Sequence, residues 1–241
     1  MSKIALVTGA NKGIGLETAR QLARDHGFTV LVGARDEGRG EEAAQTLQKE
    51  GLDAHFLQID PTNEESIAKA VQEVGEKYGH LDVLVNNAGT GSPEDRVAPS
   101  QVSLQVFRDI YEINLFGVHA VTQAFWPLLE KSDAARVVVV SSALGSLTLH
   151  ADPNGPFGDY KATAYDSSKA AVNMLTLHYA YQWKDTPHRV NTIHPGSVVT
   201  DLNPEGDIPV EEGAKTSVDL ATIGADGPNG GFFHLGKELP W

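Results

Sequence analysis

The stretch Ile4-Ala5-Leu6-Val7-Thr8-Gly9-Ala10-Asn11-Lys12-Gly13-Ile14-Gly15 decides the fold of this 241-residue chain. Residues 4–7 form a short apolar run, which predicts a strand, and residues 16–23 after the glycines predict a helix. Glycines let the backbone turn tightly and approach a pyrophosphate, while the free N–H groups at a helix start favour an anion. Strand, glycine turn and helix in this order predict a nucleotide site.

Further apolar runs predict the rest of a sheet. They lie at residues 28–32, 54–59, 81–85, 137–140 and 190–193, with a seventh candidate strand at 230–234. Because these runs are nearly continuous, both faces of their sheet must be covered by helices. One-face helical periodicity appears between them at two sets of residues: Ile67, Val71, Val74 and Tyr78; and Leu104, Phe107 and Tyr111. We therefore expect residues 1–241 to form a single-domain α/β fold, a Rossmann-like doubly wound parallel sheet of about seven strands with helices on both faces.

Composition and net charge disfavour several classes of binding partner. The formal net charge of -13 disfavours nucleic acid and anionic membrane surfaces, which are themselves negative. The chain has no cysteine, and its nine histidines show no metal-ligand spacing, so we expect no metal site. No apolar run approaches the roughly 20 residues of a membrane span, and the first strand begins too early for a signal peptide. These features predict a soluble, intracellular protein, and the absence of cysteine fits the reducing cytoplasm.

Tyr165 and Lys169 are the strongest candidates for chemistry outside the glycine turn. Their spacing places a phenol and an ammonium one helical turn apart, on one face of a predicted helix. Tyrosine is a poor acid, with an ordinary pKa of about 10, but a nearby positive charge favours its ionised form. Such a tyrosine can exchange a proton with a substrate oxygen. The same spacing also arises by chance on solvated helix faces.

Several motifs together carry a family resemblance. The turn Gly9-x-x-x-Gly13-x-Gly15, the tetrapeptide Asn86-Asn87-Ala88-Gly89 and Tyr165-x-x-x-Lys169 resemble the short-chain dehydrogenase/reductase family. The resemblance covers nearly the whole chain in the expected order, and Asn11-Lys12 and Ala34-Arg35-Asp36 are similar to its NADPH-dependent carbonyl reductases.

The resemblance implies four catalytic residues, namely Asn114, Ser142, Tyr165 and Lys169. Tyr165 would be the general acid as hydride reaches a carbonyl, and Lys169 would lower its pKa and bind the nicotinamide ribose. Ser142 would hold the substrate oxygen, and Asn114 would hold a water that links Lys169 to solvent. We favour Ser142 over Ser141 because residues 142–145 match the family's Ser-x-x-Gly pattern, and neighbouring strand residues face opposite ways.

The resemblance also implies a cofactor site and its preference. Ala34 stands at the position where an acid would bind a free ribose 2'-hydroxyl, so Arg35 and Lys12 are expected to flank a 2'-phosphate, which favours NADPH over NADH. Alternatively, Arg35 is a solvated residue partly neutralised by Asp36. The implied cofactor contacts are Gly9, Asn11, Lys12, Gly13, Ile14, Gly15, Arg35, Asp60, Asn87, Ala88, Gly89, Tyr165, Lys169, Pro195, Gly196, the Val198 backbone and the Thr200 hydroxyl.

Two features depart from the family pattern. Asp60 would accept a hydrogen bond from the adenine amino group, but Pro61 has no N–H, so a neighbouring adenine contact should be missing or shifted. Residues 60–63 also predict a helix start. Ser142 and Tyr165 are 23 positions apart, so we expect a loop at 147–160 over the pocket, within substrate loops at about 143–164 and 197–213. Tyr160 resembles a second candidate tyrosine only superficially, because Ala164 follows where a lysine would be needed.

The resemblance thus implies an oxidoreductase that transfers hydride from NADPH to a ketone or aldehyde, reversibly, to give an alcohol. A 3-oxoacyl-carrier reductase, which would need a basic surface for its acidic carrier, and a hydroxysteroid-type dehydrogenase are alternatives. An NADP-sensing regulator is the non-enzymatic alternative. A monomer and a homo-oligomer both stay open.

Overall fold

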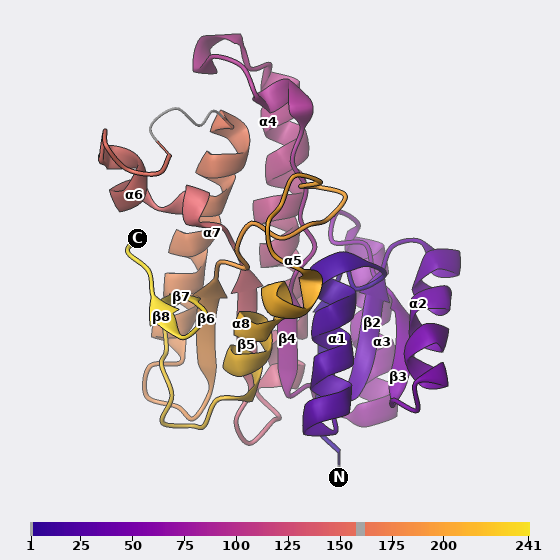
Figure 1. Ribbon diagram of the computed structural model, residues 1–241. Coiled ribbons are helices and arrows are strands. Elements are labelled where there is room, and N and C mark those ends of the chain that lie inside the picture. Colours follow the sequence, from indigo (N-terminus) through magenta and orange to yellow (C-terminus); the bar gives the residue numbers. More distant parts are fainter. Residues whose placement is uncertain (1, 158–161) are drawn as a thin grey trace.

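One mostly parallel sheet forms the centre of the computed structural model, which describes residues 2–157 and 162–241 (Figure 1). Its strands are β1 (Ile4–Thr8), β2 (Thr29–Ala34), β3 (Ala54–Gln58), β4 (Val83–Asn86), β5 (Arg136–Val140), β6 (Arg189–Ile193), β7 (Phe232–His234) and β8 (Lys237–Glu238). They lie in the order β3-β2-β1-β4-β5-β6-β7-β8, and only the β7–β8 pair is antiparallel. The doubly wound parallel sheet expected from the sequence is confirmed.

The strand order reverses beside β1. The chain builds β2 and β3 on one side of β1 and then crosses to pair β4 with its other side, so that Val7 lies between Val32 and Val85. In sheets of this kind, ligands bind outside the carboxyl ends of the strands at the point where the order reverses. The turns after β1 and β4 therefore mark the expected binding edge.

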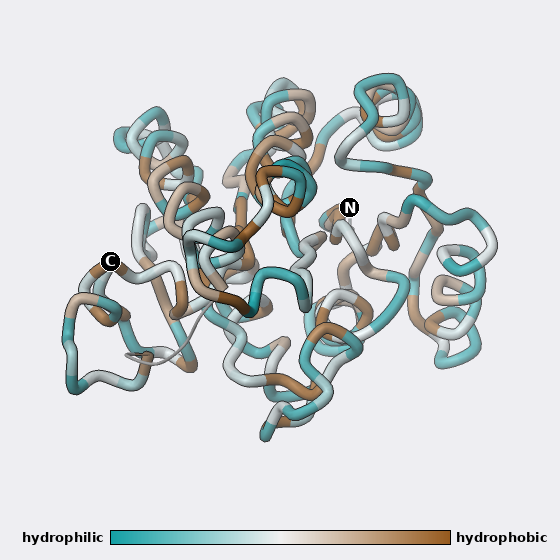
Figure 2. Tube along the Cα trace, turned by 90° about the horizontal axis from the view of Figure 1, so that it is seen from above, coloured by the Kyte–Doolittle hydropathy of each residue, from teal (hydrophilic) through white to brown (hydrophobic). Residues whose placement is uncertain are grey.

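Helices cover both faces of the sheet. Their bounds are α1 (Gly13–His26), α2 (Glu37–Lys49), α3 (Glu64–Tyr78), α4 (Leu104–Tyr111), α5 (Val118–Leu129), α6 (Leu147–Ala151), α7 (Thr163–Gln182) and α8 (Val210–Thr222), with a π-helical turn at Glu112–Gly117 and 3-10 turns at Pro93–Asp95, Pro99–Gln101 and Ala143–Gly145. Figure 2 shows the chain from above, with hydrophobic and hydrophilic residues mixed along its coiled segments.

Two cores explain why the strand sequences are apolar throughout. Leu6 of β1 packs in the core on the side of α3, α5 and α7, whereas its neighbour Val7 packs in the core on the side of α1, α2 and α8. Both side chains are fully buried. Successive residues of a strand point to opposite faces, so a strand between two helical layers needs apolar side chains at every position.

The helix boundaries follow from local capping. Asp36 accepts a hydrogen bond from Arg39 N (2.9 Å) at the start of α2, and Asn63 accepts one from Ser66 N (2.9 Å) at the start of α3. α3 ends at Gly79, which adopts φ +79°, a conformation that favours glycine. The helix start predicted at residues 60–63 is confirmed.

The apolar stripe expected on the helix at residues 104–111 is displaced. Val106 and Ile110 are the buried residues of α4 and pack against Ala164, while Leu104 is 64% exposed. Leu104 opens the helix directly after its Ser103 cap, so it lies at the outer end of α4 and not over the core. The prediction that Leu104 faces the core was wrong.

The C-terminal segment adds an eighth strand to the expected set. Predicted strand 230–234 begins at Phe232, because Gly230 still turns with φ +78°, and β8 then pairs back on β7. The ring of Phe232 stacks on Trp241 at 5.4 Å between centroids, and Trp126 stacks on Trp183 at 4.0 Å. The tryptophans therefore act as packing groups. Among the described residues, no helix has both the length and the apolar character to cross a membrane.

Candidate active site

The glycine turn after β1 needs its glycines for two separate reasons. Gly9 and Gly13 adopt φ values of +63° and +56°, which residues with side chains rarely reach. At Gly15, a Cβ atom would collide with Asn87 Nδ2 and lie 2.7 Å from the Gly9 carbonyl oxygen. At these three glycines the turn presents only backbone atoms beside the first turn of α1, which leaves room for a pyrophosphate. We call Gly9, Gly13 and Gly15 the glycine cradle.

Hydrogen bonds fasten the turn after β4 to the turn after β1. Thr8 Oγ1 accepts from the backbone N–H groups of Asn87 (3.0 Å) and Ala88 (3.1 Å). Asn87 Nδ2 donates to the carbonyl oxygens of Thr8 (2.9 Å) and Gly9 (3.2 Å). Two motifs that lie almost 80 residues apart in the chain therefore form one rigid edge.

Two cations expected beside a 2'-phosphate have different surroundings. Arg35, at the end of β2, is exposed, and its neighbour Asp36 bonds Arg39, both through the α2 cap and through the Arg39 guanidinium at 3.4 Å. Asp36 therefore caps a helix, and the hydrogen bonds from Arg39, followed by the charges of Arg39 and Arg35, lower its pKa. Lys12 Nζ donates to Asp201 Oδ2 at 2.5 Å, across 189 residues of sequence. This partner of Lys12 was missed by the sequence analysis.

Asp60 and Pro61 lie where β3 leads into α3. Asp60 Oδ1 accepts from Thr62 N (3.0 Å) and Thr62 Oγ1 (2.8 Å), so the carboxylate stabilises this turn. Pro61 packs against Gly117, where a Cβ atom would come within 2.8 Å of Pro61 Cβ. Pro61 thus contacts the π-helical turn, a packing role that the sequence did not predict.

Lys169 is a deeply buried charged group of the candidate site. Its side chain comes from the second turn of α7, is 5% exposed, and donates through Nζ to the carbonyl oxygen of Val140 at 2.9 Å. Lys169 Nζ lies 5.5 Å from the centroid of the Tyr165 ring. Burial lowers the pKa of Lys169 to about 8. The expected phenol and ammonium therefore lie side by side, on a helix anchored to the end of β5.

Asn114 joins the turn after β4 to α7. It is fully buried in the π-helical turn, accepts from Thr90 N at 2.8 Å, and donates to Thr90 O (2.9 Å) and Ser168 Oγ (3.1 Å). A Cβ atom on Gly89 would lie 3.5 Å from Asn114 Oδ1 and 3.6 Å from Lys169 Nζ. Gly89 therefore lies between the two side chains, and the π-helical turn directs the amide inward. Single π-helical turns often occur at functional sites.

The two serines after β5 have different partners. Ser141 Oγ donates to the carbonyl oxygen of Lys169 at 3.4 Å, which directs it to the backbone of α7. Ser142 Oγ accepts from Leu144 N at 3.2 Å at the start of the 3-10 turn. A hydroxyl can still donate its hydrogen while it accepts, so Ser142 keeps the capacity to bind a substrate oxygen.

The loop after β6 lies against the glycine turn. Gly196 adopts φ +94° after Pro195, and Val198 is buried. A Cβ atom on Gly13 would lie 3.6 Å from Thr200 Cγ2, so Thr200 lies beside the glycine turn, and the cofactor contact of its hydroxyl stays a prediction. Of the second predicted loop, residues 210–213 form the first turn of α8 instead.

The segment between Ser142 and Tyr165 contains α6. A depression of about 310 Å³ lies between α6 and α7, lined among others by Leu144, His150 and Asp166. His150 Nε2 lies 3.8 Å from Asp166 Oδ2. Asp166 precedes Lys169 by three positions, so at 100° per residue the two side chains lie about 60° apart around α7. The predicted cover at 147–160 stays a prediction, and Tyr160 lies outside the described residues.

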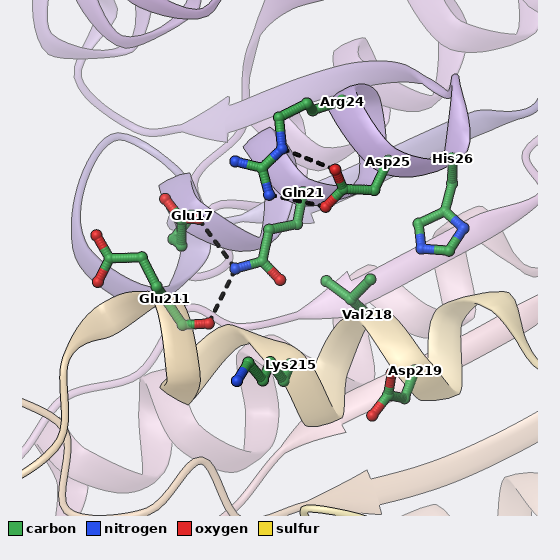
Figure 3. A pocket seen from close by; sticks show the side chains of 9 residues that line it. All are labelled: Glu17, Gln21, Arg24, Asp25, His26, Glu211, Lys215, Val218 and Asp219. Atoms are coloured by element: carbon green, nitrogen blue, oxygen red, sulfur yellow. Dashed lines mark hydrogen bonds and ion pairs between the residues drawn. The ribbon is translucent and has the colours of Figure 1, made fainter.

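Another depression lies on the outer helical layer. It measures about 370 Å³, lies between α1 and α8, and is shown in Figure 3. Arg24 and Asp25 form an ion pair there, and Gln21 donates to Glu17 Oε1 and Glu211 O, each at 2.9 Å. None of the predicted site residues lines it. We do not assign this depression to the active site.

The fold and the site define a class before any comparison. A glycine cradle at the reversal point of a doubly wound sheet, with a buried lysine beside a tyrosine at the same edge, is the arrangement of a dinucleotide-dependent enzyme. A family model described as short chain dehydrogenase matches residues 3–207. The chain belongs to the short-chain dehydrogenase family.

Individual relatives match over almost their full length. The chain is 34% identical to (+)-neomenthol dehydrogenase of Arabidopsis thaliana, over 96% of this chain and 95% of the relative. It is 33% identical to carbonyl reductase (NADPH) 1 of Rattus norvegicus, over 99% and 98% respectively. The solved structure of an NADPH-bound carbonyl reductase from chicken fatty liver superimposes with a TM-score of 0.84 at 26% identity, over 100% of this chain and 99% of that one.

Proposed function

We propose that this protein is an NADPH-dependent reductase that converts a ketone or an aldehyde to an alcohol, and that the reverse oxidation uses the same residues. The observation that carries the proposal is the buried Lys169 ammonium 5.5 Å from the Tyr165 ring, at the sheet edge that also holds the glycine cradle. The proposal is supported by the similarity to a rat carbonyl reductase (NADPH) and to an NADPH-bound carbonyl reductase from chicken. The substrate is a small-molecule carbonyl compound.

We assign each of the four residues the role that the family resemblance implies. NADPH, when bound, supplies the hydride. Tyr165 donates a proton to the carbonyl oxygen, and the positive charge of Lys169 favours the phenolate that remains. Ser142 donates a hydrogen bond to the same oxygen and stabilises its developing charge. Asn114, bonded to Thr90 and Ser168, holds the turn beside Lys169 in place and helps to return protons from solvent.

The residues present fit a phosphorylated dinucleotide. The bare glycine backbone at Gly9, Gly13 and Gly15 admits a pyrophosphate, and the cations Lys12 and Arg35 supply local positive charge in a protein of net charge -13. Thr200 and the turn Asn87-Ala88-Gly89 lie beside that cradle. We infer a preference for NADPH over NADH on this ground. A cytoplasmic location and the oligomeric state stay predictions.

The other activities have less support. A 3-oxoacyl-carrier reductase would need a basic docking surface, and a hydroxysteroid-type dehydrogenase would use the same catalytic residues on a particular ketone. Burying an ammonium is costly, so a buried lysine beside a tyrosine indicates a use for both groups. A regulator that only senses NADP would not need this pair. The carbonyl reductase is therefore the function that we propose.

NADPH oxidation with a panel of carbonyl compounds tests the proposal. The panel contains acetophenone, benzaldehyde, menadione, a 3-ketosteroid and acetoacetyl-coenzyme A, each measured with NADPH and with NADH, and product chirality is recorded. We expect turnover of at least one ketone or aldehyde with a clear preference for NADPH. Tight NADPH binding without turnover of any compound would favour the sensor. Turnover of the thioester alone would favour the acyl reductase.

A further inference from the structure

We propose that Asp95 is a positioning residue of the active site, which fixes the start of α7 and so the place of the Tyr165 hydroxyl. The inference rests on the proposed role of Tyr165. Asp95 ends the 3-10 turn Pro93–Asp95 and lies 70 positions before Tyr165 in the chain. Its local sequence indicates no such role.

Asp95 caps α7 from outside the helix. Its Oδ1 accepts from Ala164 N at 2.9 Å, and its Oδ2 accepts from Tyr165 N at 2.8 Å. The first N–H groups of a helix have no partner within that helix. Ala162, the residue before α7, offers no side-chain acceptor of its own. Asp95 therefore accepts hydrogen bonds from two backbone N–H groups that have no acceptor within the helix, and one of them is the N–H of Tyr165.

The burial of Asp95 shows how closely it depends on α7. Its relative exposure is 0%, and burying a carboxylate is costly unless its oxygens are hydrogen-bonded. Both oxygens of Asp95 are bonded to the helix start, where the helix dipole also favours a negative charge. The carboxylate and the first turn of α7 hence stabilise each other.

Asp95 lies at the end of a short segment that begins at the turn after β4. Only a few residues separate Gly89 from Asp95, and the Asn114 amide holds Thr90 at one end of this segment through both its N–H and its carbonyl oxygen. A Cβ atom on Gly91 would lie 3.6 Å from Tyr165 Cδ2, so the segment runs along the tyrosine ring. The segment from Thr90 to Asp95 thus links the turn after β4 to Tyr165.

A displacement of the Tyr165 hydroxyl should lower kcat more than it weakens NADPH binding. The phenol donates its proton only when its oxygen lies within hydrogen-bond reach of the carbonyl oxygen, and a misplacement of 1 Å can cost on the order of 100-fold in rate. The glycine cradle and the cations Lys12 and Arg35, in contrast, do not contact Asp95 through any hydrogen bond of the described residues. Loss of Asp95 should therefore lower kcat and leave NADPH affinity nearly unchanged.

The test compares Asp95→Ala and Asp95→Asn with Glu94→Gln as a matched control, because Glu94 is an exposed carboxylate in the same 3-10 turn. For each full-length variant we would measure thermal unfolding, the Kd of NADPH, and kcat and KM with the panel compound that the wild type reduces fastest. We expect Asp95→Ala to lower kcat by on the order of 10- to 100-fold, with Kd within about twofold of wild type. Asp95→Asn, which keeps one acceptor oxygen, should recover part of kcat, and Glu94→Gln should match wild type.

The results separate this inference from the proposed function. Unchanged kcat in Asp95→Ala, or a loss of kcat that only follows a loss of folded protein and of NADPH binding, would overturn the positioning role. If Asp95→Ala does not fold, Asp95→Asn decides, and wild-type kcat in that variant overturns the role. Tyr165→Phe is measured in parallel. Full activity of Tyr165→Phe would contradict the proposed function, whereas an inactive Tyr165→Phe with a fully active Asp95→Ala would contradict this inference alone.

Discussion

The ammonium of Lys12 lies 2.5 Å from the carboxylate of Asp201, so the glycine turn after β1 is joined to the loop after β6. The side chains of the two residues are 60% and 77% exposed, and exposed ion pairs contribute little to stability. The hydrogen bond from Lys12 lowers the pKa of Asp201, so this carboxylate is charged at neutral pH. Asp201 thus pairs with Lys12, which is one of the two cations that we assign to the 2'-phosphate of NADPH.

Replacing Asp201 by Asn should strengthen NADPH binding. The substitution removes a competing anion from Lys12, and the gain should be up to about fivefold in Kd, since the exposed pair is weak. Fluorescence titration of NADPH and NADH measures the effect, which should be smaller for NADH. Asp207→Asn, the same charge change at an exposed position of the same loop, is the control. Weaker NADPH binding in Asp201→Asn would mean instead that the ion pair holds the loop in its binding position.

Replacing Arg35 by Asp should shift the cofactor preference toward NADH. The exposed guanidinium at the end of β2 would be exchanged for an acid that repels a 2'-phosphate and accepts from a free 2'-hydroxyl. Charge-assisted hydrogen bonds of this kind suggest a change on the order of 10- to 100-fold in the ratio of kcat/KM values. Arg24→Asp, at the outer α1–α8 surface, should leave that ratio unchanged. An unaltered ratio in Arg35→Asp would refute the phosphate role.

Lys169 should make the stability of the protein without nucleotide rise with pH. Its pKa is about 8 in the folded protein and 10.5 in the unfolded chain, so folding penalises the charged form. The penalty is complete below pH 8 and fades as pH rises toward 10.5, where only the unfolded chain still binds the proton. The free energy of unfolding of wild type relative to Lys169→Met should therefore rise by up to about 3 kcal/mol over this range. Urea unfolding at pH 7.5 and 10 measures it, and a pH-independent difference would contradict the burial of the charge.

Asp166 should make the stability of the protein fall with rising pH, and it should do so at lower pH than Lys169 acts. Burial, followed by the charge of Asp95, raises the pKa of Asp166 to about 7, so the folded protein holds a proton there that the unfolded chain loses near pH 4. Stability from this group therefore falls as pH rises from about 4 to 7. Asp166→Asn should be more stable than wild type at pH 8, by on the order of 2 kcal/mol, and equal to it near pH 3.5.

A carboxylate with the reverse pKa shift provides the control for Asp166. A hydrogen bond from Arg24 lowers the pKa of Asp25, so Asp25→Asn should lose stability relative to wild type at pH 8 and not gain it. Thermal unfolding of both variants from pH 3.5 to pH 8 measures the two slopes. If Asp166→Asn were no more stable than wild type at pH 8, the Asp166 carboxyl would be solvated and not buried beside Asp95.

Contiguous motifs allowed much of the fold and the site to be predicted. The glycine turn and the Tyr165–Lys169 pair depend on spacings fixed by a strand–turn–helix junction and by one helical turn, so both could be read directly from the chain. Strands such as β5 and β6 begin one residue before the apolar runs that predicted them, because Arg136 and Arg189 use their side chains to bond loop carbonyl groups while their backbones pair.

Long-range partners could not be predicted in this way. Asp95 and Asp201 bond residues 70 and 189 positions away, and nothing in their local sequence indicates a cap or a phosphate-site partner. Asp201 does lie in the stretch Ser197–Asp201 after Pro195-Gly196, but a single acid in a loop has many possible partners. The inward face of α4 was also misjudged, because the periodicity of Leu104 and Phe107 does not reveal that the helix packs on α7 through Val106 and Ile110.

Turnover and NADPH binding of Tyr165→Phe, measured on the same preparation, test the central claim most directly. The substitution removes only the phenolic oxygen and its proton, while Lys169 and the glycine cradle stay in place. The proposed mechanism predicts a loss of at least about 100-fold in kcat, the lower range for a general acid, with the Kd of NADPH within about twofold of wild type. Undiminished kcat in a folded Tyr165→Phe that binds NADPH normally would contradict the assignment of Tyr165 as the proton donor.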